Sequence, residues 1–201
     1  MYNLGLAQIL FKMITIISGT NRPDSRTKLI ASYCLQALAE VGEEAQLLDL
    51  VNINLPILSD EMYKTSGQHP YITTLQDKFL INSDHWLIVS PEYNGSFPGI
   101  LKLFLDAVSV RNYKETFSGK SASMIGVATG RAGNFRGMEH LTGILNYLNV
   151  VVMPNKLPVS VVDKNISENG SIEIATAAVL SSFLEDLILF YRNQRQKKGV
   201  F

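Results

Sequence analysis

The chain has 201 residues, an apolar share of 46%, and 18 basic against 18 acidic side chains, which gives a formal net charge of zero. This length fits one domain of ordinary size with a good core. The balanced charge argues against nucleic acid or a membrane surface as a partner. The single cysteine, Cys34, excludes an intrachain disulfide and a cysteine-rich metal site, which suits a cytoplasmic protein.

Residues 1–12 are interpreted as an N-terminal extension. They lack the basic region and the small-residue cleavage site of a signal peptide, and no apolar run in the sequence reaches the length expected of a membrane span. The first expected strand begins at Met13, so we expect residues 13–201 to form one domain. Met13 is then a candidate native start, which mass spectrometry of the native protein would test.

Short apolar segments alternate with segments of helical periodicity along the rest of the chain. The expected strands are 13–17, 45–50, 85–89, 121–128 and 150–153, and a further extended piece is expected at 158–162. The expected helices are 29–41, 71–82, 98–110, 138–148 and 172–196. This alternation predicts an α/β fold with a parallel, doubly wound sheet. A flavodoxin-like sandwich with five strands in the order 2-1-3-4-5 fits best, and it brings the loops after the first and third strands into one crevice.

The loop after the first strand is rich in hydroxyl and basic side chains. Because a helix N-terminus presents free amides and partial positive charge, this loop favours a phosphate cradle. Its candidate residues are Thr20, Arg22, Ser25 and Thr27. A plain N-cap at Ser25 or Thr27 is the alternative, but it accounts for only one of the hydroxyls. The loop lacks the glycines of a dinucleotide fingerprint and the lysine of a Walker loop.

The loop after the third strand, residues 90–99, suits a flat ligand. Tyr93 offers a ring face, and Asn94 and Gly95 permit backbone angles that turn amides outward. A simple helix entry built from good turn residues is the alternative interpretation of this segment.

The three histidines are too scattered along the chain to predict a metal site. We expect His85, at the start of the third strand, to cap that strand or to face solvent. Cys34 and Trp86 lie in apolar patterns and are expected to be part of the core.

Three segments resemble motifs of the NADPH-dependent FMN reductase family, which also includes quinone, azo-dye and chromate reductases. Residues 17–25 are similar to the family's G-S-x-R-x-x-S loop, and residues 91–102 to its P-E-Y-N-x-S-x-P-G-x-L-K segment. Residues 129–137 resemble, more weakly, its S-x-G-x-x-G-G-x-R segment. The similarity extends over residues 13 to about 190.

The resemblance implies three groups of FMN-binding residues. The phosphate would be held by Thr20, Arg22, Ser25 and Thr27. The isoalloxazine ring would be lined by Pro91, Glu92, Tyr93, Asn94 and Gly95, and its other edge would be closed by Thr129, Gly130 and Gly133.

The resemblance also implies an activity in which the flavin carries the chemistry. NADPH, with NADH also possible, would pass a hydride to N5 of FMN, and a flavin, quinone, azo compound or similar small molecule would accept two electrons. No catalytic side chain and no metal are then expected. A non-catalytic FMN- or phosphate-binding module of the same fold is the alternative. An electron carrier like flavodoxin is disfavoured, because the chain has no acidic excess.

The same resemblance implies a homodimer or homotetramer with the helix at 97–110 in the interface. That helix is apolar on nearly every side. A helix that is apolar all round must be covered all round, which independently favours a subunit contact.

Overall fold

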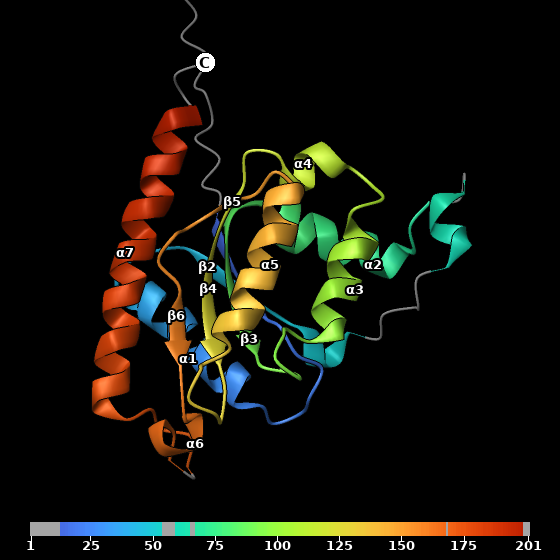
Figure 1. Cartoon of the computed structure of the whole chain (residues 1–201). Coiled ribbons are helices and arrows are strands. Elements are labelled where there is room, and N and C mark those ends of the chain that lie inside the picture. Colours follow the sequence, from blue (N-terminus) through green and yellow to red (C-terminus); the bar gives the residue numbers. More distant parts are fainter. Residues whose placement is uncertain (1–12, 54–58, 65–66, 168, 199–201) are drawn as a thin grey trace, which may run out of the picture.

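A parallel β-sheet forms the middle of the molecule (Figure 1). The computed structural model describes residues 13–53, 59–64, 67–167 and 169–198, so the expected extension at 1–12 lies outside the described residues. The strands are β1 (Met13–Ser18), β2 (Ala45–Asp49), β3 (Ser83–Pro91), β4 (Ser121–Val127), β5 (Val151–Val152) and β6 (Leu157–Val159). Their order is β2-β1-β3-β4-β5, which confirms the predicted topology, and β6 also pairs with β4.

One edge of the sheet is divided between two short strands. β4 pairs with β5 through Ser121 and Ala122, and with β6 through residues 125–127. Pro154 lies between the two short strands and has no amide hydrogen for a ladder, which fits an interrupted edge. The expected strand at 150–153 is therefore shorter, and the expected extended piece at 158–162 becomes β6.

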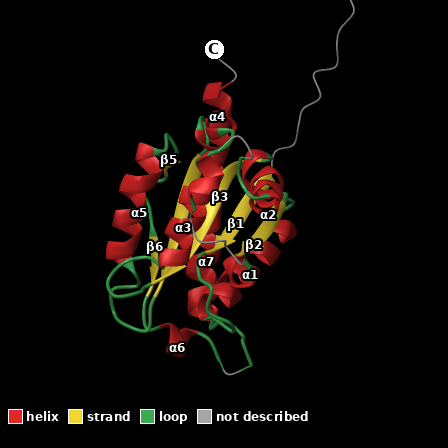
Figure 2. Ribbon diagram, turned by 90° about the vertical axis from the view of Figure 1, so that its right-hand side faces the viewer, coloured by secondary structure: helices red, strands yellow, loops and turns green. Residues whose placement is uncertain are grey.

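Helices cover both faces of the sheet (Figure 2). They are α1 (Arg26–Glu40), α2 (Pro70–Leu75), α3 (Gly99–Val108), α4 (Tyr113–Phe117), α5 (Phe135–Tyr147), α6 (Val162–Asn165) and α7 (Ile174–Lys198). Three short turns are η1 (Leu50–Asn52), η2 (Asp60–Tyr63) and η3 (Gln76–Ile81). The helix expected at 71–82 is α-helical in its first half and continues as the wider π-helical turn of η3.

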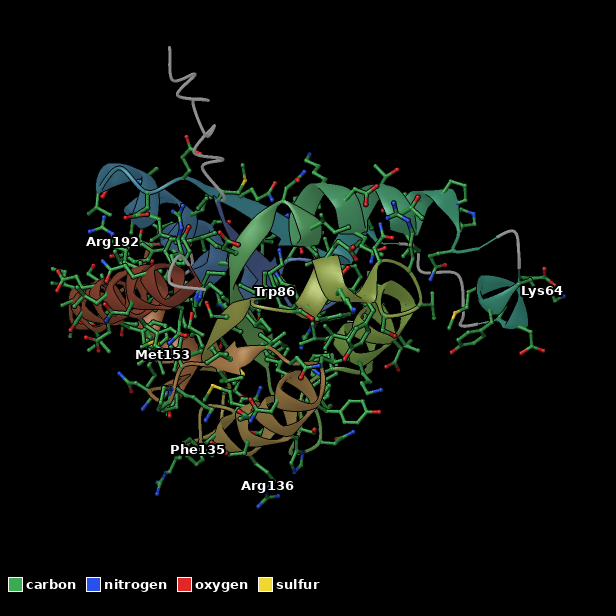
Figure 3. All side chains as sticks on the ribbon, turned by 90° about the horizontal axis from the view of Figure 1, so that it is seen from above. Lys64, Trp86, Phe135, Arg136, Met153 and Arg192 are labelled. Atoms are coloured by element: carbon green, nitrogen blue, oxygen red, sulfur yellow. The ribbon has the colours of Figure 1, made fainter. Side chains whose placement is uncertain are left out.

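Alternating side chains of the strands build two separate cores. On β3, Trp86 and Ile88 join the core beneath α3 and α5, whereas Leu87 and Val89 join the core beneath α1 and α7. Figure 3 shows Trp86 near the middle of the molecule. Cys34 lies in the second core, as expected, and burial raises the pKa of its thiol to about 12.

The expectation that His85 caps the strand or faces solvent is wrong. The ring is completely buried, and its Nδ1 and Nε2 lie 2.8 Å and 3.0 Å from the hydroxyl oxygens of Ser121 and Ser123. The parallel register of β3 and β4 places both serines beside it, and Phe190 and Tyr191 of α7 cover the ring. Burial lowers the pKa of His85 to about 3, so the imidazole is neutral.

Among the described helices, α7 is long and apolar enough, by length and composition, to cross a membrane. The sequence analysis did not expect such a segment. One side of α7 packs into the second core of this fold. The buried residues on that side are Leu180, Phe183, Leu184, Leu187 and Tyr191. A cytoplasmic location stays a prediction.

Candidate functional site

A cavity of about 670 Å³ opens at the carboxyl ends of β1, β3 and β4, a size typical of small-molecule sites. In Figure 1 the arrowheads of the strands point toward this end of the molecule, where α6 lies. Its walls come from four segments, with the residues at 20 and 22–27, 91–93, 127–130 and 162–163. The loops after the first and third strands therefore meet in one crevice, as the predicted strand order requires.

The first loop and the start of α1 form one end of the cavity. All four predicted phosphate-cradle residues line it. Ser25 is the N-cap of α1, because its Oγ accepts a hydrogen bond from the amide of Lys28 at 3.2 Å. The first turn of α1 contains no acidic residue, so its unpaired amides and partial positive charge remain available to an anion.

A hydrogen bond between side chains links the two predicted loops. The hydroxyl oxygens of Thr20 and Tyr93 lie 2.9 Å apart, and the amide of Arg22 donates to Thr20 Oγ1 at 3.2 Å. Thr20 is almost fully buried, whereas Tyr93 is partly exposed on the cavity wall. The ring of Tyr93 is thus held by a residue of the phosphate-cradle loop.

Asn94 and Gly95 shape the segment that carries Tyr93 and do not themselves line the cavity. Tyr93 and Ser96 exchange two backbone hydrogen bonds of 2.8 Å and 3.0 Å around them. Both turn residues have positive φ, 52° and 76°, which is the geometry of a type I′ hairpin turn. Pro91 and Glu92 line the cavity, and the amide of Glu92 donates to the carbonyl oxygen of Val127 at 2.9 Å.

The third predicted segment is only partly at the cavity. Thr129 and Gly130 line it, but Gly133 does not. Gly133 instead packs against β6, because a Cβ added there would lie 2.5 Å from the Cβ of Pro158. Gly133 also has a φ of +54°, which glycine adopts easily. Its role is therefore to shape this loop from outside the cavity.

The sequence analysis missed Asn134 as a residue of the site. Its side chain is completely buried, and Nδ2 donates to the carbonyl oxygens of Ser90 at 3.0 Å and Pro91 at 2.9 Å. It has a φ of +60° at the start of α5. Asparagine between a glycine and a helix is a signal for a left-handed residue, but its two partners lie more than forty positions away. Asn134 therefore ties the end of β3 to the segment between β4 and α5.

Further residues of α5 lie against the Tyr93–Ser96 turn. Ser96 Oγ lies 3.0 Å from His140 Nδ1. A guanidinium nitrogen of Arg136 lies 3.2 Å from the position that a Cβ on Gly95 would occupy. Figure 3 shows Phe135 and Arg136 at the edge of the molecule on α5. The ring of Phe135, the first residue of α5, is exposed.

A second missed element is α6, which supplies Val162 and Asp163 to the cavity wall. Asp163 Oδ1 lies 3.5 Å from Nε of Arg26 in the first turn of α1. The sequence analysis took this region as a loop with a short extended piece, and no local pattern places its carboxylate beside the first loop.

Comparison with known proteins finds a matching family and two similar relatives. Residues 13–163 match the family described as NADPH-dependent FMN reductase. The chain is 30% identical over 185 residues to a 2-hydroxy-1,4-benzoquinone reductase of Burkholderia sp., covering 90% of this chain and 97% of that protein. It is 31% identical over 134 residues to an NAD(P)H-dependent FMN reductase of Pseudomonas aeruginosa, covering 67% and 69% of the two chains.

A solved structure with a similar fold is the flavoenzyme NAD(P)H:(acceptor) oxidoreductase of Paracoccus denitrificans. The TM-score is 0.77 at 22% identity, and the match covers 91% of this chain and 98% of that chain. At this identity the likeness shows the flavodoxin-like fold alone. The family match covers most of the chain, and the protein is therefore an oxidoreductase that belongs to the NADPH-dependent FMN reductase family, with FMN and NAD(P)H as its cofactors.

Proposed function

We propose that the protein is an FMN-dependent NAD(P)H oxidoreductase that reduces a small-molecule acceptor such as a flavin, a quinone or an azo compound. The observation that supports this most directly is the cavity itself. It combines a helix N-terminus rich in hydroxyl and guanidinium groups with the ring of Tyr93 from the loop after β3. The Thr20–Tyr93 hydrogen bond joins the two parts.

The residues of the cavity fit the two ends of FMN. Arg22, Thr27 and the first amides of α1 offer charged and neutral donors to a phosphate group. At the other end, Tyr93 supplies a ring face, and Val127 and Ala128 supply apolar surface. This division of donors and apolar surface matches a ligand with a phosphate at one end and a flat aromatic ring at the other.

The backbone amides divide into those that hold the loops and those that remain for a ligand. The amides of Glu92 and Tyr93 already donate to Val127 and Ser96. Within the described residues, the amides of Thr129 and Gly130 donate to no protein acceptor. We assign these two amides the role of donors to the polar edge of the flavin ring.

The chemistry that bound FMN supplies is acceptance of a hydride from NADPH at N5, followed by transfer of two electrons to the acceptor. The chain's own residues bind and orient the ring, and their preorganised donors stabilise negative charge on it. No side chain is assigned as an acid, a base or a nucleophile. The partly exposed position of Tyr93 leaves room for acceptors of different shapes.

The first experiment is a visible absorption spectrum of the purified protein with FMN added, followed by anaerobic NADPH and, separately, NADH. A bound-flavin spectrum that bleaches rapidly supports the proposed reductase. A bound flavin that stays oxidised with both nucleotides favours the non-catalytic binding module. Failure to take up FMN refutes the proposed function. Arg22→Gln is the matched variant, and its FMN dissociation constant should rise about tenfold because a charged hydrogen bond to phosphate is lost.

We also propose that α3 contributes to an interface between two copies of the chain. Leu101, Phe104 and Leu105 are buried, but Leu103 on the outer side of the helix is 39% exposed. The resemblance to the family implies a subunit contact at this helix, and Leu103 is the exposed apolar side chain of α3 that such a contact would cover. Light scattering on the protein as it elutes from a size-exclusion column measures its mass and so tests this interface. A Leu103→Glu variant should shift a dimer or tetramer toward the monomer, and an unchanged mass would refute this interface.

A further inference from the structure

We propose that Asp163 weakens the affinity of the cavity for phosphate and so governs discrimination between FMN and riboflavin, its unphosphorylated counterpart. The carboxylate neutralises Arg26 in the absence of a phosphate and repels a phosphate that enters. The inference rests on the proposed function, because it concerns the phosphate end of the same cavity.

The backbone before Asp163 is held in an unusual conformation. Val161 has a φ of +50°, which is rare for a β-branched residue. Its amide donates to the carbonyl oxygen of Gly130, and the amide of Val162 donates to that of Ala128, each at 3.0 Å. Val162 is buried in the second core. Asp163 is therefore carried on a turn that is anchored to the cavity wall itself.

The carboxylate lies at the phosphate end of the cavity. Its Oδ1 is 3.5 Å from Nε of Arg26, the first residue of α1, and both residues line the cavity. The side chain of Asp163 is 61% exposed and that of Arg26 is 36% exposed. The ion pair is thus long and exposed to solvent, so a phosphate can replace the carboxylate as the partner of Arg26.

The charged side chains of the cavity do not favour an anion on balance. Arg22 and Arg26 are opposed by Asp24, Glu92 and Asp163, so the lining has one more negative than positive side chain. A phosphate monoester carries about −1.5 to −2 charge at neutral pH. Among these carboxylates, Asp163 is the one that lies beside Arg26. Removing its charge therefore has two effects: it frees Arg26 to bind the phosphate, and it reduces the repulsion of the phosphate.

The consequence is a site in which the ring end carries a larger share of flavin affinity than the phosphate end. The affinity for FMN exceeds that for riboflavin by a smaller factor than it would if both Arg22 and Arg26 were free to bind the phosphate. Because the pair is exposed, the effect is modest: neutralising Asp163 should tighten FMN about three- to fivefold and leave riboflavin unchanged. The gain should shrink as salt screens the charges.

The test is a fluorescence titration of FMN and of riboflavin with wild type, Asp163→Asn and Asp77→Asn, at low and high salt. Asp77 pairs with Arg111 away from the cavity, so its variant matches the loss of one paired carboxylate. We expect only Asp163→Asn to tighten FMN selectively. In an Arg26→Gln background the gain from Asp163→Asn should be smaller, because one of its two causes is removed.

Three outcomes would overturn the inference. They are an unchanged or weaker affinity of Asp163→Asn for FMN, an equal gain for riboflavin, and an equal gain from Asp77→Asn. In each case wild type still binds FMN, so the proposed function stands. Wild type that binds no FMN would instead refute the proposed function, and the inference with it.

Discussion

Replacing Asn134 by aspartate should destabilise the fold strongly, although the two side chains have nearly the same shape. Nδ2 of Asn134 donates to the carbonyl oxygens of Ser90 and Pro91 at 3.0 Å and 2.9 Å in a fully buried position. Aspartate places an oxygen there, which cannot donate when ionised. The variant therefore loses both hydrogen bonds and brings a carboxylate against two carbonyl oxygens.

The magnitude follows from these two losses. Each hydrogen bond contributes about 1 kcal/mol, and each carbonyl left unpaired costs further desolvation. A buried carboxylate without a partner adds several kcal/mol or takes up a proton. We expect a loss of about 3 kcal/mol or more in the free energy of unfolding at pH 7. The loss should shrink toward pH 4, because a protonated carboxyl can donate one hydrogen bond to these carbonyls.

Urea unfolding followed by circular dichroism measures the effect, with Asn134→Gly as the matched control. Glycine tolerates the φ of +60° and removes the same two bonds without adding a charge. It also removes the buried Oδ1, which has no partner among the described residues. Asn134→Gly should therefore lose about 2 kcal/mol, which is less than Asn134→Asp because no charge is buried. An Asn134→Asp variant that is as stable as wild type, or more stable than Asn134→Gly, would refute the reasoning.

Three further predictions test the fold and the site. Stability of wild type should fall from about pH 6.5 toward pH 3, by up to about 4 kcal/mol, because the unfolded state alone protonates His85 in that window; urea unfolding of His85→Gln should lack this component. Gly126→Ala should lower the free energy of unfolding by more than about 2 kcal/mol, since the new Cβ would lie 2.1 Å from the carbonyl oxygen of Gly133. Gly143→Ala is the control, because its Cβ would meet nothing within 4 Å. Thermal melts should show a lower melting temperature for Gly126→Ala and little change for Gly143→Ala. Tyr93→Phe should raise the FMN dissociation constant about threefold through loss of its hydroxyl bond, as a fluorescence titration would show; an unchanged constant would contradict that role.

The sequence predicted the topology because each element carries its own local signal. β-Branched runs such as 13–17 alternate with amphipathic helices, and only a few connections are compatible with that alternation. The meeting of the first and third loops follows from the order of the strands. The Thr20–Tyr93 hydrogen bond is one physical result of that meeting.

The sequence could not predict contacts that depend on register and long-range packing. His85 looked like a residue at a strand end, but its side chain is buried because the register with β4 supplies two hydroxyl partners. Asn134 and Asp163 each act on residues more than forty positions away. A single chain gives no local pattern for such pairs, whereas its glycines and asparagines do indicate where turns occur.

The two ends of the cavity differ in how firmly they are built, and this difference bears on function. At the ring end, Asn134 is fully buried and fixes two consecutive carbonyl groups. At the phosphate end, the Arg26–Asp163 pair is exposed and loose. Under the proposed function, a rigid ring end preserves the orientation that hydride transfer needs, and an adjustable phosphate end moderates how tightly the flavin is held. On that proposal the chain separates positioning of the flavin ring from affinity for the flavin, so the variants at Asn134 and Asp163 should change different quantities.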